Sequence, residues 1–226
     1  MTDASTARKT TATSATDSSV LDTMTHADLP QLEAYYDRWS ATYEDDLLSK
    51  GYDAPVRAAE ILDQHGVDRA RPVLDAGCGT GLTGLHLKKR GFSAVIGADY
   101  STASLDKARE KGCYADLKRL DMNQTLGFPD NHFAAAQCIG ALTYVKNMAG
   151  LMREFQRVVC PGGIVSFTHR LDLYTESFKT LLKKIEDEGL WTSIHRSEPQ
   201  PYIPGHQDFG DDKAIIYDVF RVNAPA

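Results

Sequence analysis

The residues of this chain that could do chemistry begin with a carboxylate followed by a run of glycines. The segment VLDAGCGTGLTG, residues 73–84, ends an apolar run at Asp75 and then places four glycines within eight residues. Glycine allows a turn with positive φ and lets the backbone approach a ligand closely. The segment is therefore typical of one of two structures. One is a turn at the start of a helix that binds a nucleotide-like ligand, and the other is a tight turn that binds no ligand.

A second acidic residue stands at the distance that a nucleotide site requires. Asp99 ends the next apolar run, twenty-two positions after Gly77. A carboxylate at that place can accept hydrogen bonds from both hydroxyls of a ribose. A glycine-rich turn alone is weak support for a ligand. The turn, Asp75 and Asp99 in a strand–helix–strand context together predict a nucleotide-like cofactor.

The elements that would position these residues alternate along the chain. Strands are expected over residues 72–77, 93–100, 117–122, 133–142, 164–170, 190–198 and 214–222. Helices are expected over residues 56–66, 82–91, 101–112, 147–160 and 174–189, the fourth stopped by Pro161-Gly162-Gly163. This alternation predicts an α/β fold with a Rossmann-like, doubly wound, seven-stranded and mostly parallel sheet. The last two strands have no helix between them, so they should form an antiparallel C-terminal hairpin.

The chain divides into a tail and one domain. Residues 1–28 are rich in Ser, Thr and Ala and nearly lack large apolar side chains, which predicts a disordered tail. A transit peptide is the alternative, but Asp3, Asp17 and Asp22 count against it. Residues 29–226 are expected to form a single domain.

Composition excludes several classes of protein. The 226 residues carry a net charge of -6, which argues against a general nucleic-acid binder. The four cysteines have no C-x-x-C spacing, so no metal site is expected. No apolar stretch has the length of a membrane span, and the N-terminus lacks an apolar signal core. We therefore expect a cytoplasmic protein without membrane partners.

The motifs resemble those of the class I S-adenosylmethionine-dependent methyltransferases. VLDAGCGTG is similar to their first motif and VIGADYS to their second. LDMNQTLGFPDNHFAAAQCIGALTYV resembles the third and fourth, and EFQRVVCPGGIVSFTHR resembles the helix, turn and strand that follow. The resemblance covers residues 35–222. More narrowly, YYDRWSATYEDDLLSKGYDAP is similar to the N-terminal signature of the Williams–Beuren syndrome region methyltransferase-like proteins.

The resemblance implies S-adenosyl-L-methionine as the cofactor and a role for each residue of the first two motifs. Asp75 and the turn that contains Gly77, Cys78, Gly79 and Gly81 would hold the methionine end. Asp99 would bind the ribose.

The adenine and methyl ends of the cofactor follow from the later motifs. Tyr100 would lie beside the adenine, and Asp121 would accept a hydrogen bond from its amino group, next to the Met122 backbone. Cys138, Ile139 and Gly140 would form the floor near the methyl group. Ordinary core packing is the alternative for Tyr100, Met122 and Cys138.

The N-terminal part of the domain carries an aromatic stripe. Tyr36, Trp39 and Tyr43 recur at i, i+3 and i+7, which places them on one face of a helix. Such a stripe usually packs in a core. The resemblance instead implies a helical lid over the cofactor, where an aromatic face would suit a sulfonium cation.

The reaction itself requires few catalytic groups. Methyl transfer from a sulfonium is an in-line displacement, so positioning is the main task, and a base is needed only for a protonated acceptor. His169 at the end of the fifth strand, Tyr144 after the fourth, and His206 between the closing strands are candidate bases. A lone histidine is more often structural.

The acceptor is narrowed by motifs that the chain lacks. No [DNS]-P-P-[YF] follows the fourth strand, where the sequence has IGAL, and no Pro-Cys or Thr-Cys pair stands there. With the acidic net charge, this favours a small-molecule O, S or N acceptor over nucleic acid. The oligomeric state stays open.

Two other functions compete with methyl transfer. A nicotinamide-dependent oxidoreductase shares the glycine turn, but it normally carries G-x-G-x-x-G rather than the G-x-G-x-G of GCGTG. A non-catalytic module that binds S-adenosylmethionine or a partner would keep the fold without turnover. Measuring turnover with candidate acceptors would separate it from an enzyme.

Overall fold

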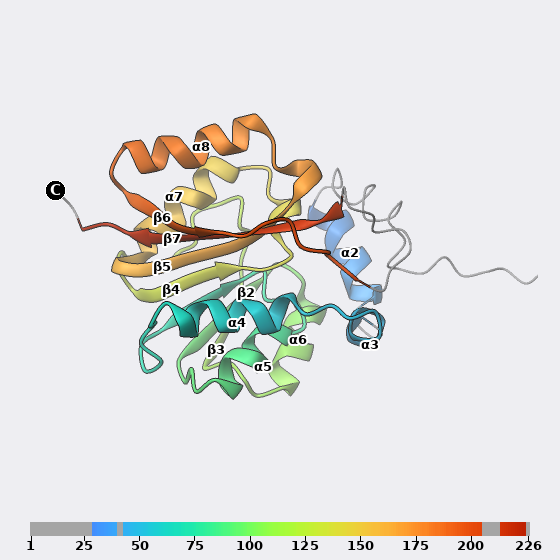
Figure 1. The fold of residues 1–226 in the computed structure, drawn as a ribbon. Coiled ribbons are helices and arrows are strands. Elements are labelled where there is room, and N and C mark those ends of the chain that lie inside the picture. The colour runs from blue at the N-terminus through green and yellow to red at the C-terminus, as the bar shows by residue number, and fades with distance from the viewer. Residues whose placement is uncertain (1–28, 40–42, 205–212, 225–226) are drawn as a thin grey trace, which may run out of the picture.

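A seven-stranded sheet runs through the centre of the molecule, with helices on both faces (Figure 1). The structure is a computed structural model that describes residues 29–39, 43–204 and 213–224. The strands, in chain order, are β1 (Val73–Ala76), β2 (Val95–Asp99), β3 (Asp116–Arg119), β4 (Phe133–Cys138), β5 (Val159–Arg170), β6 (Trp191–Arg196) and β7 (Ile215–Val222).

The strand order is β3-β2-β1-β4-β5-β7-β6. β1 to β5 pair in parallel, whereas β7 pairs antiparallel with both β5 and β6. This confirms the predicted α/β fold, a Rossmann-like, mostly parallel sheet with an antiparallel C-terminal hairpin. The chain reverses its direction of travel across the sheet between β1 and β4, the point at which open α/β sheets bind ligands.

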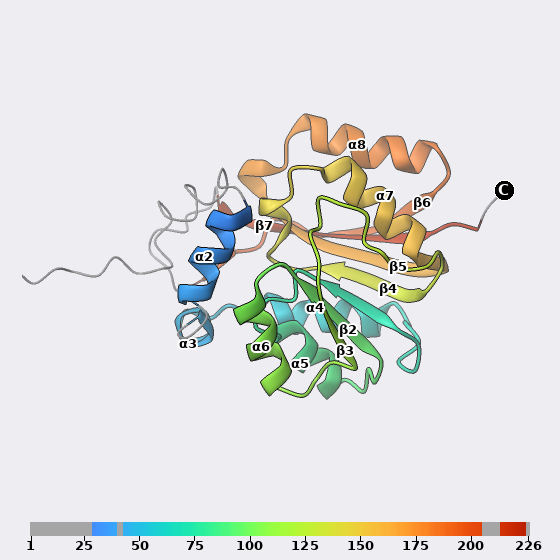
Figure 2. The same ribbon diagram turned by 180° about the vertical axis from the view of Figure 1, so that it is seen from behind.

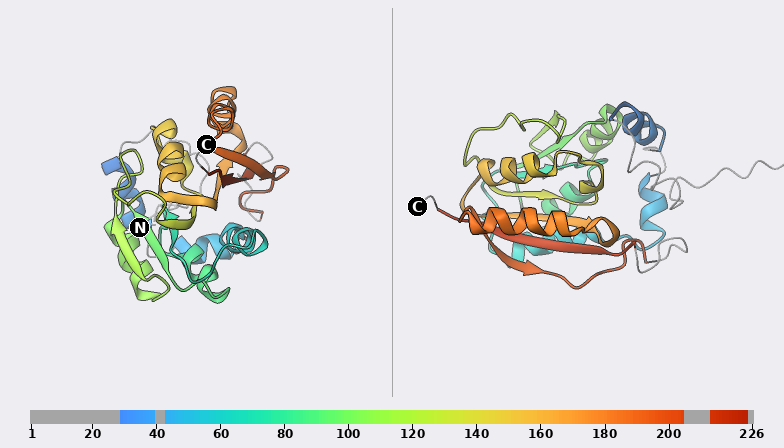
Figure 3. Two further views of the ribbon diagram at one scale, coloured as in Figure 1. Left: turned by 90° about the vertical axis from the view of Figure 1, so that its left-hand side faces the viewer. Right: turned by 90° about the horizontal axis from the view of Figure 1, so that it is seen from above.

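Helices cover the two faces of the sheet unequally, as Figure 2 and the end-on view in Figure 3 show. One face carries α4, α5 and α6, and the other carries α7 and α8, while α2 lies against α6 at one end of the sheet. The helices are α2 (Leu29–Trp39), α3 (Tyr43–Leu48), α4 (Ala54–Gln64), α5 (Leu82–Lys89), α6 (Thr102–Glu110), α7 (Met148–Val158) and α8 (Glu176–Asp187), with short 3-10 turns η1 (Leu142–Tyr144) and η2 (Leu171–Leu173).

Side chains of the central strands alternate between two apolar layers, as the pleat of a strand requires. Val73 of β1 packs in one cluster with Leu62 of α4 and Leu87 of α5. Its neighbour Leu74 belongs to the opposite cluster, with Phe155 of α7. All five are fully buried, and burying a side chain of this size contributes about 1.5–3 kcal/mol. This packing fixes the carboxyl end of β1, where the glycine turn begins.

Helix ends follow the sequence closely except at α7. Ser101, rather than Thr102, caps α6, and its side chain accepts a hydrogen bond from the Ser104 N–H. The expected end of this helix is wrong, because α7 ends at Val158, before the Pro161-Gly162-Gly163 turn that was expected to stop it. Val159 already pairs with β4, and residues 160–163 form an irregularity before the ladder resumes. Sheet pairing of Val159 therefore ends the helix before Pro161 can.

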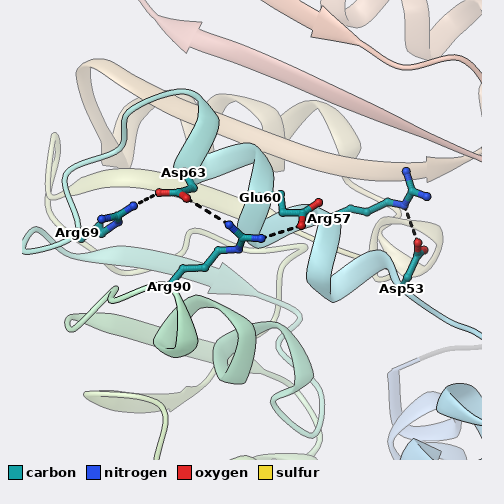
Figure 4. Close-up of polar contacts among 6 residues, drawn as sticks. All are labelled: Asp53, Arg57, Glu60, Asp63, Arg69 and Arg90. Carbon is teal, nitrogen blue, oxygen red and sulfur yellow. Dashed lines mark hydrogen bonds and ion pairs between the residues drawn. The ribbon is translucent and has the colours of Figure 1, made fainter.

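Polar side chains tie α4 to α5 within one helical layer (Figure 4). Arg90, directly after α5, donates to Glu60 at 2.7 Å and to Asp63 at 3.2 Å, and Arg69 also pairs with Asp63. These groups are partly exposed, and such pairs contribute about 0–1 kcal/mol each. The packing of α4 against the sheet depends mainly on its buried apolar side chains, such as Leu62.

Two sequence predictions concern residues that the structure does not describe or describes in part. The expected tail, residues 1–28, lies outside the described residues, so its disorder and the domain boundary stay predictions. The stretch expected to carry one aromatic stripe is described as two helices, α2 and α3. Among the described helices, none is both long enough and apolar enough to cross a membrane.

Candidate active site

A cleft opens at the carboxyl ends of the central strands, beside α2. It encloses about 860 Å³ of space unfilled by protein atoms, part of it open to solvent. Its walls come from the turn after β1, the end of β2, the segment after β3, the segment after β4, and α2. The lining residues are Leu32, Glu33, Gly77, Gly79, Thr80, Asp99, Tyr100, Ser101, Ser104, Leu120, Asp121, Met122, Asn123, Gly140, Ala141, Tyr144 and Val145.

The glycine turn is held by β2 and needs glycine for two different reasons. The Gly77 and Cys78 N–H groups both donate to the Ala98 carbonyl, at 2.7 and 3.0 Å. Gly77 has φ +72°, and a Cβ there would lie 2.4 Å from the Cβ of Ala141. Gly79 has φ +51°, but a Cβ there would meet no protein atom within 4 Å. Gly77 is thus required by packing, whereas the backbone of Gly79 faces open space.

Asp99 connects the glycine turn to the start of α6. Its Oδ2 accepts a hydrogen bond from the Gly79 N–H at 2.8 Å, and its Oδ1 accepts one from the Ser101 N–H at 2.9 Å. Burial raises the pKa of this carboxyl, and the backbone donors oppose that shift. Each carboxylate oxygen retains a lone pair for a further donor. A ligand with two adjacent hydroxyls could therefore bind here.

Asp121 is oriented by the residue two positions later. Its Oδ1 accepts hydrogen bonds from both the backbone N–H and the side-chain amide of Asn123, at 2.8 and 2.9 Å. Asn123 in turn accepts from the Lys146 and Asn147 N–H groups at 2.7 and 3.0 Å. Asn123 therefore couples the segment after β3 to the segment after η1. The turn η1 itself carries Tyr144, which lines the cleft.

The helix α2 closes one side of the cleft through polar links to the strand ends. Arg119 donates to Glu33 at 2.9 Å, and its guanidinium lies 4.7 Å from the ring centroid of Tyr100. The Ser101 hydroxyl donates to Asp37 at 2.6 Å. These contacts place acidic groups of α2 against donors of the domain body.

The aromatic residues expected in the lid cannot be placed. Tyr36 and Trp39 belong to α2 and Tyr43 begins α3, but their side chains lie outside the described part of the chain. Their role as a lid stays a prediction.

Eight of the expected site residues line the cleft: Gly77, Gly79, Asp99, Tyr100, Asp121, Met122, Gly140 and Tyr144. Four others lie behind its surface, namely Asp75, Cys78, Cys138 and Ile139, each less than a tenth exposed. Asp75 accepts a hydrogen bond from the Tyr114 hydroxyl at 2.7 Å, and burial raises its pKa to about 7. Of the three residues expected near the methyl group, Cys138 is fully buried in the cluster beneath α7 and Ile139 packs on the α4 side. Gly140 does line the cleft, together with Ala141.

The candidate bases are separated by the structure. Tyr144 lines the cleft. The expectation for His169 is corrected, because its side chain packs between Tyr174 and Phe178, is only 5% exposed and does not line the cleft. Burial lowers its pKa to about 4. Strand alternation explains the error, since Thr168 points to the other face of β5, where its hydroxyl accepts from the Gly140 N–H. His206 lies outside the described residues.

Several cleft residues were missed from the sequence. Leu32 and Glu33 come from α2, where the aromatic stripe drew attention away from them. Asn123 could have been found, because an Asp-x-Asn stretch after a strand is typical of side chains that bond to nearby backbone. Among the residues that the structure describes, no group of three or more acidic, His or Cys side chains could hold a metal ion.

The comparisons with known proteins agree with this geometry. Residues 74–167 match the family described as "Methyltransferase domain". Human methyltransferase-like protein 27 is 32% identical over 174 residues, which cover 74% of this chain and 71% of that protein. This chain belongs to the class I S-adenosylmethionine-dependent methyltransferases. Its cofactor is S-adenosyl-L-methionine, and the nicotinamide alternative is set aside.

Further relatives of the methyltransferase differ in what they are named for. The ubiquinone biosynthesis O-methyltransferase of Pseudomonas paraeruginosa is 31% identical over 144 residues, which cover 62% of this chain and 61% of that enzyme. A solved TehB-like S-adenosylmethionine-dependent methyltransferase from Corynebacterium glutamicum has a TM-score of 0.63 at 19% identity, covering 84% of this chain and 99% of that one. That likeness concerns the fold of the methyltransferase alone.

Proposed function

We propose that the cleft binds S-adenosyl-L-methionine in an extended pose across the carboxyl ends of the strands. In this pose Asp99 accepts hydrogen bonds from the ribose hydroxyls, and Asp121 accepts one from the adenine amino group. The turn from Gly77 to Gly79 faces the methionine end. Tyr100 and Met122 flank the adenine, and Leu32 and Glu33 of α2 cover it.

One observation carries this proposal. The exposed backbone of Gly79, the carboxylate of Asp99 and that of Asp121 come from separate strand ends but line one cleft. Asp99 bonds directly to the Gly79 N–H, so the sugar and methionine subsites are fixed relative to each other. Such a prearranged set of acceptors beside an open backbone suits a nucleoside with an amino-acid extension.

We propose further that the methyl acceptor is a small molecule that attacks through O, S or N. Bound S-adenosyl-L-methionine would supply a methyl group carried on its sulfonium. A lone pair of the acceptor would form a bond to the methyl carbon as the carbon–sulfur bond breaks, and the sulfur would keep that bonding pair. Gly140, Ala141 and Tyr144 form the floor of the cleft where that acceptor would lie. Among the candidate bases, Tyr144 is the described one that lines the cleft, and we assign it the role of orienting the acceptor.

Two features favour a small acceptor. The chain carries a net charge of -6, which does not favour binding of a polyanion such as a nucleic acid. The curated relatives that it matches include proteins named for ubiquinone and sterol methylation.

Turnover with a panel of acceptors tests this function. Purified protein would be incubated with radiolabelled S-adenosylmethionine and separate catechol, phenol, thiol and amine acceptors, with tRNA and a mixed-peptide pool beside them. We expect label in at least one small molecule, and Tyr144→Phe should raise the KM for that acceptor. Label in RNA or peptide alone would contradict the acceptor class. Binding of S-adenosylhomocysteine without any transfer would favour the non-catalytic module.

A further inference from the structure

A tyrosine ring occupies a space that three glycines leave open beneath the first motif. Tyr114 precedes β3, and its ring lies between α5 and β2. A Cβ on Gly84 would lie 2.2 Å from the Cζ of Tyr114, and one on Gly97 would lie 2.9 Å from its Cδ1. A Cβ on Gly81 would lie 3.1 Å from its Cε2. Gly84 is therefore required by this ring, and Gly97 by this ring together with Leu117, whose Cδ2 would lie 2.7 Å from such a Cβ. Neither glycine lines the cleft.

The hydroxyl of Tyr114 makes two hydrogen bonds at the end of this space. It donates to the Oδ2 of Asp75 at 2.7 Å and accepts from the Gly84 N–H at 3.2 Å. The N-cap of α5 is Gly81, which has no side chain to accept from the first-turn N–H groups. The Tyr114 oxygen fills that role from outside the helix. One hydroxyl thus joins the start of α5 to the acid of the first motif.

Asp75 needs such a donor because it is buried. Asp75 is only 1% exposed and stands just before the glycine turn. Asp99, whose charge disfavours ionisation of Asp75, is its acidic neighbour across that turn. The titratable groups of the described residues that interact with its carboxyl are Tyr114, Asp99, Cys78, Cys113 and Cys138.

None of these five neighbours supplies a positive charge. The three thiols are buried, and burial raises the pKa of each, so they stay neutral near pH 7. The hydrogen bond from Tyr114 is the interaction that lowers the pKa of Asp75, whereas burial and Asp99 raise it. A buried carboxylate in this setting is ionised only if a donor or a cation compensates its desolvation.

We propose that Tyr114 is a positioning residue of the cofactor site, which holds Asp75 ionised and oriented behind the glycine turn. Asp75 then acts on the cofactor as a buried negative charge rather than as a cleft-lining contact. The ammonium group at the methionine end is the cation that this charge favours. The inference rests on the proposed placement of that end at the turn.

The consequence is a pH dependence of cofactor affinity with a definite sign. Asp75 has a raised pKa, about 7, so in the free protein it gains its charge as the pH rises through neutrality. Affinity for a cationic ligand should therefore rise with pH over this range. Removing the Tyr114 hydroxyl removes the bond that favours the charged form, so the rise should shift to higher pH.

Calorimetric titration with S-adenosylhomocysteine between pH 5.5 and 8.5 tests this assignment. That ligand carries the ammonium but no sulfonium, so it isolates the methionine end. Four proteins are compared: wild type, Tyr114→Phe, Asp75→Asn and the double variant. We expect the midpoint of the affinity curve to move up by roughly one unit in Tyr114→Phe, the size of one hydrogen bond to a charged group. Near pH 7 this shift lowers the affinity of Tyr114→Phe by up to about tenfold, and the affinity recovers toward pH 8.5.

The double variant separates positioning from mere structure. If Tyr114 acts through Asp75, the hydroxyl should have no effect on the pH profile in the Asp75→Asn background. A loss in Tyr114→Phe that is equal at every pH, or that persists unchanged in the double variant, would overturn the proposal. Failure of the wild type to bind S-adenosylhomocysteine would instead contradict the proposed cofactor site itself.

A second measurement tests the proposal even if the Tyr114→Phe variant does not fold. Incorporating 3,5-difluorotyrosine at position 114 keeps the ring and makes its hydroxyl a stronger donor. The midpoint should then move to lower pH than in the wild type. An unchanged or raised midpoint would contradict the proposal.

Discussion

At the scale of single residues, Asn123 joins the two segments that carry the adenine end of the proposed site. Its amide donates to Asp121, and its oxygen accepts from Lys146 and Asn147. Asn123→Ala removes these bonds, and each such bond contributes about 1 kcal/mol. We expect the affinity for S-adenosylhomocysteine to fall about tenfold, measured by calorimetry. Asn223→Ala is the matched control, because Asn223 bonds to Thr192 and Gly189 away from the cleft, and its affinity should not change. Equal losses in both variants would contradict the role of Asn123.

The residues that sequence predicts best are those with a fixed place on a strand end. Asp99 and Asp121 were predicted and line the cleft, because Asp99 ends β2 and Asp121 lies in the segment just after β3. Asp75 and His169 were also assigned to the site, but each side chain is buried away from its surface. Sequence shows that a residue ends a strand, but the neighbours decide which group it bonds. The partner of Asp75 comes from Tyr114, thirty-nine positions later, and no local pattern indicates it.

At the scale of elements, α2 is held against the cleft by polar links, one of which comes from Arg119. Arg119 bonds to Glu33 and to the Tyr100 carbonyl, and it stacks on the Tyr100 ring. Arg119→Ala should loosen α2, but the pair is partly exposed, so the effect is modest. We expect S-adenosylhomocysteine to dissociate about two- to fivefold faster in stopped-flow measurements, equivalent to roughly 0.5–1 kcal/mol.

Arg109→Ala provides the control for that experiment. Arg109 is exposed on α6 and pairs with Asp106 on the same helix, so its removal should leave the dissociation rate unchanged. High salt should reduce the difference between wild type and Arg119→Ala, because it screens the exposed ion pair. A dissociation rate that Arg119→Ala does not alter would show that α2 does not retain the cofactor.

Element boundaries were predictable where a side chain or a glycine sets them. Ser101 caps α6, Thr175 caps α8, and Gly91 with φ +87° follows α5. The end of α7 was not predictable from its Pro-Gly-Gly turn, because pairing of Val159 with Phe133 ends the helix earlier. Local propensity therefore gives way where a neighbouring strand offers backbone partners.

At the scale of the whole molecule, the strand order brings the site together. Gly79 follows β1, Asp99 ends β2 and Asp121 follows β3. These strands lie side by side and parallel, so their ends meet at one edge. The floor comes from the segment after β4, across the point where the order reverses. Alternating strands and helices predict that parallel strand ends carry the site, whereas the strand order itself comes from the structure. The position of α2 over the cleft does not follow from that alternation, since it depends on side-chain links such as that between Asp37 and Ser101.

The central claim is that Asp99 holds the ribose of S-adenosylmethionine in this cleft. Calorimetric titration of the full chain with S-adenosylhomocysteine, for wild type and Asp99→Ala, tests it most directly, with NADH as the unrelated nucleotide. We expect micromolar binding by the wild type, a loss of about 1.5–3 kcal/mol in Asp99→Ala, and no binding of NADH. Equal affinity of the two proteins for S-adenosylhomocysteine would contradict the claim.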